Sequence, residues 1–193
     1  MTTVTPTPEE MEKNIVRFNT IQPKKRRTEK ESGIPAKAME SIAADSIYLY
    51  MAPKVASGSN QSPGILGLPG LTVNVCRCPP GQGPNLHCHE RTIETFMTLQ
   101  GEFKCQWGDQ GEHEITLGQF DMVSFPRNVM RRFENSDTQE SLLLVLIQGE
   151  NNDLANDIQY PSEVGEKIAA EFGVEVRKKI EDMGWRFDAN TAR

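Results

Sequence analysis

Apolar and polar residues alternate along most of residues 46–150, which is the pattern of half-buried β-strands. In the first such run, Ile47, Leu49 and Met51 alternate with two tyrosines. Turn-forming glycines separate the runs that follow. We predict further strands at Leu71–Cys78, Asn85–His89, Thr92–Leu99, Glu102–Trp107, His113–Leu117, Asp121–Phe125, Arg131–Glu134 and Leu142–Gln148. Many short strands with almost no helical pattern between them indicate an all-β fold, either an antiparallel sandwich or a barrel.

The pattern changes before this region. Residues 1–45 are mostly polar, so we predict an N-terminal arm that contains a short amphipathic helix from Met11 to Asn19. The arm also carries a basic run, Lys24–Arg27. This run has two interpretations, a contact with phosphate or nucleic acid and a solvent-exposed surface. The run is short and has no interleaved aromatic residues, which favours the exposed surface.

Beyond residue 150 the apolar spacing becomes helical. From Pro161 onward an apolar residue recurs at every fourth position, at Val164, Ile168, Phe172, Val176 and Ile180. Gly173 interrupts this stretch. We therefore predict a C-terminal helical extension over residues 151–193, with one or two amphipathic helices that close the core or contact a partner.

Composition narrows the class of protein. At 193 residues the chain has room for one ordinary domain with extensions. The formal net charge of −6 and the pI near 5.2 argue against non-specific nucleic-acid binding. No segment is apolar enough to span a membrane and the first residues lack a signal-peptide pattern, so we expect a cytoplasmic protein. In that compartment the four cysteines are expected to be reduced and mostly buried.

A cluster of potential metal ligands lies within the strand-rich region. His87 and His89 are separated by one residue in an extended stretch, so their side chains point to the same face. A turn after His89 brings Glu94 beside them on the next strand. Two imidazoles and one carboxylate suit iron(II), manganese, nickel or zinc and leave coordination positions open for a substrate or dioxygen. The cluster therefore predicts a metal site of a catalytic kind.

The residues around this cluster resemble the cupin superfamily. The spacing Gly81-x5-His87-x-His89-x4-Glu94-x6-Gly101 matches the first cupin motif at every fixed position. The second motif is expected in the stretch that follows, which keeps Asp121, Pro126, Phe133 and Asn135. The stretch departs from the motif at Phe120 and Asn128, where the family has glycine, and at Arg131, where the family has histidine.

The resemblance implies a cupin jelly-roll (double-stranded β-helix) barrel over residues 46–150. It also implies a homodimer, and a metal near the barrel centre held by three histidines and one acid. In this chain the ligand set carries over to His87, His89 and Glu94, but Arg131 cannot act as the fourth ligand because a guanidinium has no lone pair to give. Either a metal is held by three ligands and water while Arg131 clamps an anionic substrate, or Arg131 pairs with Glu94 in a metal-free pocket.

Strand alternation supplies candidates for the walls of a substrate pocket. They are Phe96, Thr98, Phe103, Trp107 and Phe133, each with ordinary core packing as the alternative. The third histidine, His113, follows a charged turn and is expected to be exposed.

These observations favour a mononuclear-metal oxygenase, with iron(II) as the favoured metal and Arg131 orienting a small anionic, possibly aromatic, substrate. The alternatives are a metal-assisted isomerase or decarboxylase, a non-catalytic binding or sensor protein, and a structural protein. No nucleic-acid or membrane partner is expected.

Overall fold

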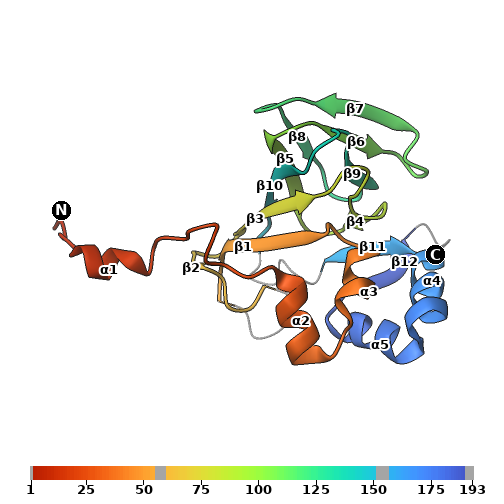
Figure 1. Cartoon of the computed structure of the whole chain (residues 1–193), viewed down its shortest axis with the longest axis horizontal. Coiled ribbons are helices and arrows are strands. Elements are labelled where there is room, and N and C mark those ends of the chain that lie inside the picture. Colours follow the sequence, from red (N-terminus) through yellow and green to blue (C-terminus); the bar gives the residue numbers. More distant parts are fainter. Residues whose placement is uncertain (1, 55–59, 151–156, 190–193) are drawn as a thin grey trace.

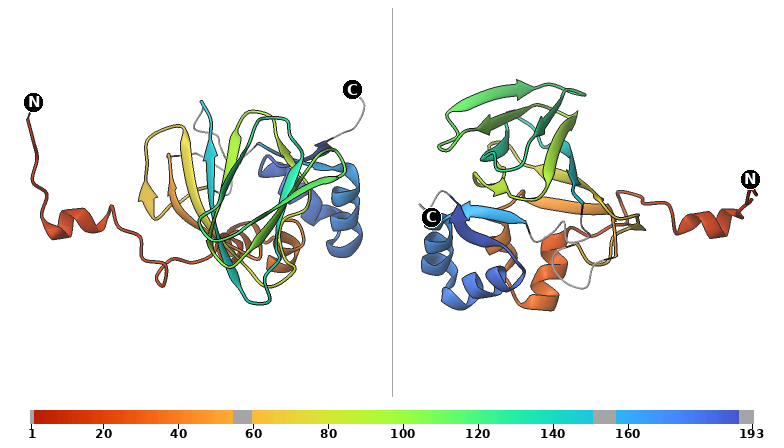
Figure 2. Two further views of the ribbon diagram at one scale, coloured as in Figure 1. Left: turned by 90° about the horizontal axis from the view of Figure 1, so that it is seen from above. Right: turned by 180° about the vertical axis from the view of Figure 1, so that it is seen from behind.

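The structure, a computed structural model, describes residues 2–54, 60–150 and 157–189. It is predominantly β-sheet, with the strands arranged in several sheets. Helices α2 to α5 gather on one side of strands β1, β11 and β12, whereas β5 to β10 lie on the other side (Figures 1 and 2). The N-terminal segment that carries α1 extends away from the rest of the molecule (Figure 1).

Hydrogen bonding groups the described strands into three sheets. The largest has the spatial order β2 (Ile65–Leu66), β1 (Ser46–Ala52), β3 (Leu71–Cys78), β10 (Ser141–Gln148), β5 (Ile93–Gln100) and β8 (Met122–Phe125). A second sheet has the order β7 (His113–Leu117), β6 (Phe103–Trp107) and β9 (Arg131–Asn135). The third has the order β12 (Arg186–Ala189), β11 (Ile158–Pro161) and β4 (Cys88–His89). Only the pairs β1–β2 and β11–β12 are parallel among these described strands.

The predicted strands between residues 46 and 150 are found, most with ends shifted by no more than one residue. The exception is β4, which spans only Cys88–His89 of the predicted Asn85–His89. Strands β2, β11 and β12 were not predicted, because each is at most four residues long and lies in a stretch without clear alternation.

The first hydrophobic core lies on the inner faces of the large sheet and the β7–β6–β9 sheet. The rings of Phe96 and Phe103 both pack edge to face on Phe133, with centroid distances of 5.0 and 5.8 Å. Alternate residues of β10 complete this core, because Leu143 and Val145 face inward while their neighbours do not. Burial of each such side chain contributes roughly 1.5–3 kcal/mol, so this aromatic cluster fixes how the two sheets pack.

Five helices are described, and they differ from the expected positions at the N-terminus. They are α1 (Pro8–Glu12), α2 (Lys24–Ser32), α3 (Ala36–Glu40), α4 (Ser162–Phe172) and α5 (Val174–Asp182). The predicted helix from Met11 to Asn19 is wrong, because a capping box formed by Thr7 and Glu10 starts the helix earlier. In the C-terminal region, Gly173 separates α4 from α5 with a φ of 96°, which glycine adopts without strain.

A second hydrophobic core joins the two ends of the chain. Ile34, Ala38 and Ile42, from in and around α3, pack with Ile168 of α4 and Ile180 of α5. Residues 34–44 of the predicted, mostly polar arm thus contribute apolar side chains to this core. These apolar residues follow helical spacing over too short a stretch to stand out in a polar sequence.

The basic run Lys24–Arg27 belongs to helix α2 and mostly makes contacts within the chain. Lys25 forms ion pairs with Glu40 and Asp45 at 2.7 and 3.1 Å, and Arg27 donates to the backbone carbonyl of Gln61. Arg26 is exposed, in line with the solvent-exposed interpretation, whereas the other three charges of the run contact groups of the chain itself. No described helix is long and apolar enough to cross a membrane.

Candidate metal centre and cavity

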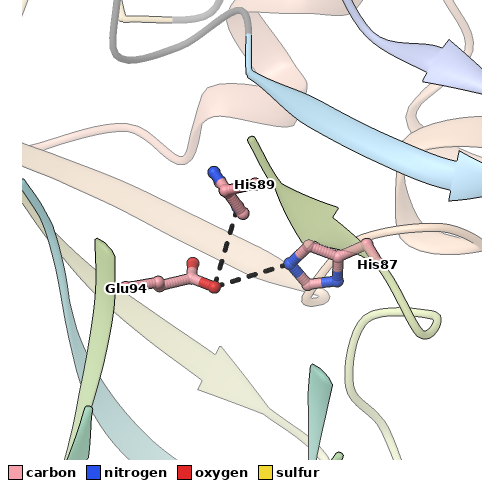
Figure 3. Close-up of side chains that lie close together, drawn as sticks. All are labelled: His87, His89 and Glu94. Atoms are coloured by element: carbon pink, nitrogen blue, oxygen red, sulfur yellow. Dashed lines mark ion pairs between the residues drawn. The ribbon is translucent and has the colours of Figure 1, made fainter. Parts of the chain in front are cut away.

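The predicted ligands come together at the junction of two strands. His89 lies in β4 and His87 just before it, where the backbone amide and carbonyl of His87 bond those of Arg131 at the start of β9. Glu94 projects from β5 toward both rings (Figure 3). Its Oε2 atom lies 3.5 Å from His87 Nε2 and 3.7 Å from His89 Nε2. The three side chains are buried, and one ligand atom from each lies within 4.8 Å of the others, so the group could hold a metal ion.

A backbone contact fixes the tautomer of His87. Its Nδ1 lies 2.8 Å from the carbonyl oxygen of Asn85, which can only accept a hydrogen bond, so Nδ1 carries a proton. In the neutral ring, Nε2 then presents its lone pair toward Glu94. This is the orientation that a metal-binding imidazole needs.

A relay of side chains fixes His89 in the same way. The Thr92 hydroxyl donates to Asp157 Oδ2 at 2.9 Å and therefore accepts from His89 Nδ1, which also lies 2.9 Å away. The Nε2 atom of His89 is buried and has no hydrogen-bond partner among the described residues. Burial, together with the charge of Arg131, lowers the pKa of His89 well below its usual range. His89 is therefore neutral at pH 7 and offers an unused lone pair.

Arg131 lies beside these ligands and contacts Glu94. Its side chain is fully buried, and Nε donates to Glu94 Oε2 at 3.0 Å while Nη1 donates to the Val129 carbonyl at 3.1 Å. Burial alone would raise the pKa of Glu94, but the charge of the adjacent Arg131 outweighs it and holds this pKa well below its usual range. Of the two positions considered for Arg131, the structure has the one in which it pairs with Glu94.

A cavity of about 90 Å³ adjoins this cluster, well below the roughly 300–1,000 Å³ of common ligand pockets, so it has room only for a very small ligand. His87 and Glu94 line one part of it, and Val145, Ile147 and Tyr160 supply apolar walls. The Tyr160 hydroxyl is occupied, since it donates to the Ile42 carbonyl at 3.1 Å.

Of the five side chains predicted to line a substrate pocket, Phe133 lines this cavity and the other four do not. Phe96 and Phe103 are fully buried in the first core, and Trp107 packs against that core. The Thr98 hydroxyl donates to the Leu117 carbonyl at 3.3 Å. These four residues are packed in the core, which was the alternative considered for each of them. They are therefore not part of the proposed site.

The structure also places the third histidine, the four cysteines and the two residues that replace motif glycines. His113 is exposed, as predicted. All four cysteines are free and buried, and burial raises the pKa of Cys76 well above its usual range, so this thiol is a poor nucleophile. Phe120 and Asn128 replace motif glycines and both have positive φ, 71° and 62°. Asparagine tolerates this conformation readily, whereas phenylalanine adopts it only under strain.

Sequence reasoning missed Thr92, Asp157 and Lys24. Thr92 stands within the first motif at a position that the motif leaves open, and Asp157 lies beyond the strand-rich region, so no spacing rule connects either to His89. Lys24, in the basic run, reaches the far part of the cavity.

Residues 74–147 match the family described as Cupin domain. This stretch contains His87, His89, Glu94 and Arg131, and runs from β3 to β10. The match covers 74 of the chain's 193 residues, so it describes the strand-rich region and not the whole chain. No curated protein matches the chain.

Several solved structures share part of the fold. A sugar phosphate isomerase of the cupin superfamily from Silicibacter pomeroyi is 28% identical, over 44% of this chain and 54% of its own, with a TM-score of 0.38. The cupin domain of Schizosaccharomyces pombe Cnp3 is 15% identical, over 44% of this chain and 59% of its own, with a TM-score of 0.36. KdgF from Halomonas sp. is 20% identical, over 47% and 80%, with a TM-score of 0.41. The chain thus spans only about half of the isomerase.

Proposed function

We propose that this protein holds a divalent transition metal at His87, His89 and Glu94 and acts on a small organic anion bound in the adjoining cavity. The observation that carries the proposal is the convergence of two imidazole lone pairs and one ionised carboxylate, with His89 Nε2 left without a hydrogen-bond partner among the described residues. Three electron-pair donors that face one point repel one another unless a cation lies between them. Iron(II) is the favoured metal, and manganese, nickel or zinc would suit the same donors.

A bound metal would supply Lewis acidity to a substrate oxygen, and iron(II) would also support the oxygenase chemistry expected from the sequence. The chain's own residues do the remaining work. Thr92 and Asp157 hold His89 neutral and oriented, and the apolar walls of the cavity exclude water. We also propose that the sheets around the cavity form the cupin jelly roll, in which the strands fix the ligand positions.

The charges at the centre point to an anionic substrate. Glu94 and Arg131 neutralise each other, so a divalent cation would leave about two positive charges in a buried site. An anion bound next to the metal offsets this excess. A neutral ligand would not.

The contact between Arg131 and Glu94 favours a second function, a metal-free protein that binds a small molecule without turnover. In this function the guanidinium takes the place of the metal, since its Nε lies 3.0 Å from the same Glu94 oxygen that faces both histidines. Arg131 would then be a permanent part of the site. The two functions differ in what happens when Arg131 is removed.

The test is a zinc titration of the chelator-treated full chain by calorimetry, alongside elemental analysis of protein purified without added metal. His87→Ala should abolish binding of one equivalent of zinc. His113→Ala is the matched control, because His113 is exposed and distant from the cluster in sequence, and it should bind as the unmodified chain does. Arg131→His should tighten zinc binding because it restores a fourth nitrogen donor and removes a charge.

Two results would contradict the metal-binding proposal. One is a purified protein that contains no transition metal and takes up no zinc. The other is equal zinc binding by the His87→Ala and His113→Ala variants. If in addition Arg131→His gains no affinity, the metal-free function is the one that stands.

A further inference from the structure

The cavity has a second polar region that lies apart from the metal ligands. Lys24, at the start of α2, lines it together with Asn60 and with Asn74 of β3. Lys24 Nζ donates to Asn60 Oδ1 at 2.5 Å. Asn74 is only 2% exposed, and its Oδ1 is buried without a hydrogen-bond partner among the described residues. A buried amide oxygen with no donor is destabilising, which indicates that a ligand supplies one.

Strand register places this region relative to the metal ligands. Glu94 of β5 is paired with Ile147 of β10, and Val145, two residues earlier on the same face, is paired with Asn74 of β3. Glu94 and Asn74 therefore lie on one face of the sheet, two strands and two residues apart, which is about 12 Å. Val145 and Ile147 fill the interval between them. The cavity is thus polar at both ends and apolar in the middle.

The charge at the second end is positive. Among the described residues that line the cavity, Glu94 is the only carboxylate, and it already pairs with Arg131. No ion pair between described residues includes Lys24. Burial lowers the pKa of Lys24 to about 7, which is the response of an ammonium group with too little compensation. An anion bound here would supply the missing charge.

Lys24 is also placed where a ligand can reach it. Besides the inner cavity it lines an outer hollow of about 390 Å³, together with Ile21, Arg27 and Gly64. It therefore lies between the two spaces and can contact a ligand from either side.

We infer that Lys24, Asn60 and Asn74 form an anion subsite that binds the carboxylate and the neighbouring hydroxyl of a small hydroxy acid. Lys24 donates to the carboxylate, Asn60 holds the ammonium group in place, and the ligand hydroxyl donates to Asn74 Oδ1. The inference rests on the proposed function in that the same ligand would extend toward the metal centre. It gives the ligand a carboxylate site at the Lys24 end of the cavity, apart from the anionic group that the proposed function places next to the metal.

The experiment compares three probes of similar size on the full chain, with and without zinc. Lactate has both groups, propionate lacks the hydroxyl, and lactamide lacks the charge. By NMR titration we expect lactate to bind about tenfold more tightly than either of the others. Lys24→Met should weaken lactate binding at least tenfold, and Lys30→Met, an exposed lysine of the same helix, should leave it unchanged.

Asn74→Leu adds a readout that a merely structural role would not give. It should lower lactate affinity to the level of propionate and leave propionate affinity as it was. Asn74→Leu should also melt at or above the temperature of the unmodified chain, because it removes a buried carbonyl oxygen that has no donor among the described residues.

Failure of this inference can be told apart from failure of the proposed function. No lactate binding by the unmodified chain, or equal lactate binding by Lys24→Met and Lys30→Met, overturns the subsite, whatever the zinc titration shows. Lactate binding that depends on Lys24 in a chain that takes up no zinc supports the subsite and overturns only the metal centre.

Discussion

The two ends of the cavity differ in both their origin and their charge. The end with His87, His89 and Glu94 lies within the segment that matches the Cupin domain family, and its ionised acid already has a partner in Arg131. The other end depends on Lys24 and Asn60, which lie outside that segment, and it is positively charged. The first end suits a cation and the second suits an anion. The comparison teaches that, in the functions proposed above, the metal ligands come from the segment that matches the family, whereas Lys24 and Asn60, which would contact the ligand, come from outside it.

The largest expected effect comes from breaking the ion pair at the first end. Glu94→Gln leaves the Arg131 guanidinium buried without its carboxylate, which should lower the free energy of unfolding by about 3–5 kcal/mol. Urea denaturation measures the change. The double variant Glu94→Gln with Arg131→Met removes both charges and should recover most of the loss. A single variant within about 1 kcal/mol of the unmodified chain would show that the pair is not the buried contact described above.

How much of the metal-ligand end the sequence could predict depends on how far apart its residues lie in the chain. His87, His89 and Glu94 lie within eight residues, so strand alternation and one turn suffice to bring them together. The contact of Arg131 with Glu94 was one of two alternatives, because alternation gives the face of a side chain but not which neighbour it bonds. Asp157 lies far along the chain from His89, and only the pairing of β11 with β4 brings it near.

The Lys24 end of the cavity could not be predicted from the sequence, because its residues meet only through tertiary packing. Lys24 stands in a basic run whose neighbours pair with surface acids, so nothing in its sequence context marks it as a cavity residue. Asn74 alternates with apolar residues on β3 and is indistinguishable from a polar residue on the outer face. Their meeting depends on the packing of α2 against β1, a tertiary contact with no periodic signature.

The second prediction sharpens the first end by testing the relay that orients His89. Thr92→Val removes the hydroxyl between His89 and Asp157 and should weaken zinc binding about 10- to 100-fold, because the ring loses its fixed tautomer. Thr95→Val is the control, since the Thr95 hydroxyl contacts Ser124 and not a ligand. Equal zinc affinities in the two variants, measured by calorimetry, would show that the relay does not act on the metal site.

The third prediction concerns pH and the second end. Lys24 faces Cys76 of β3 and Arg27 of its own helix, and burial lowers the pKa of Lys24 to about 7. Below that pH its ammonium group is charged and lactate binding should be constant, because the carboxylate stays ionised down to about pH 4. Above it, affinity should fall by up to about tenfold per pH unit, since binding must also take up a proton. Lys24→Met should bind weakly at every pH, and a profile as steep as that of the unmodified chain would assign the titration to another group.

The smallest expected effect is a change in stability at Asn74, which tests whether this residue serves ligand binding or folding. Asn74→Leu should raise the free energy of unfolding by about 1 kcal/mol, because it removes a buried carbonyl oxygen that has no donor among the described residues. The control is Asn135→Leu on β9, which is equally buried but donates to the carbonyls of Cys78 and Gln139 at 2.8 Å each. That change should destabilise the chain by about 1–3 kcal/mol. Thermal and urea unfolding of the two variants measure whether the stability changes differ in sign.

If Asn74→Leu destabilised the chain as much as Asn135→Leu, Asn74 would be a structural residue. A gain in stability together with a loss of lactate binding would mean that Asn74 lowers the stability of the empty protein and is kept for its ligand.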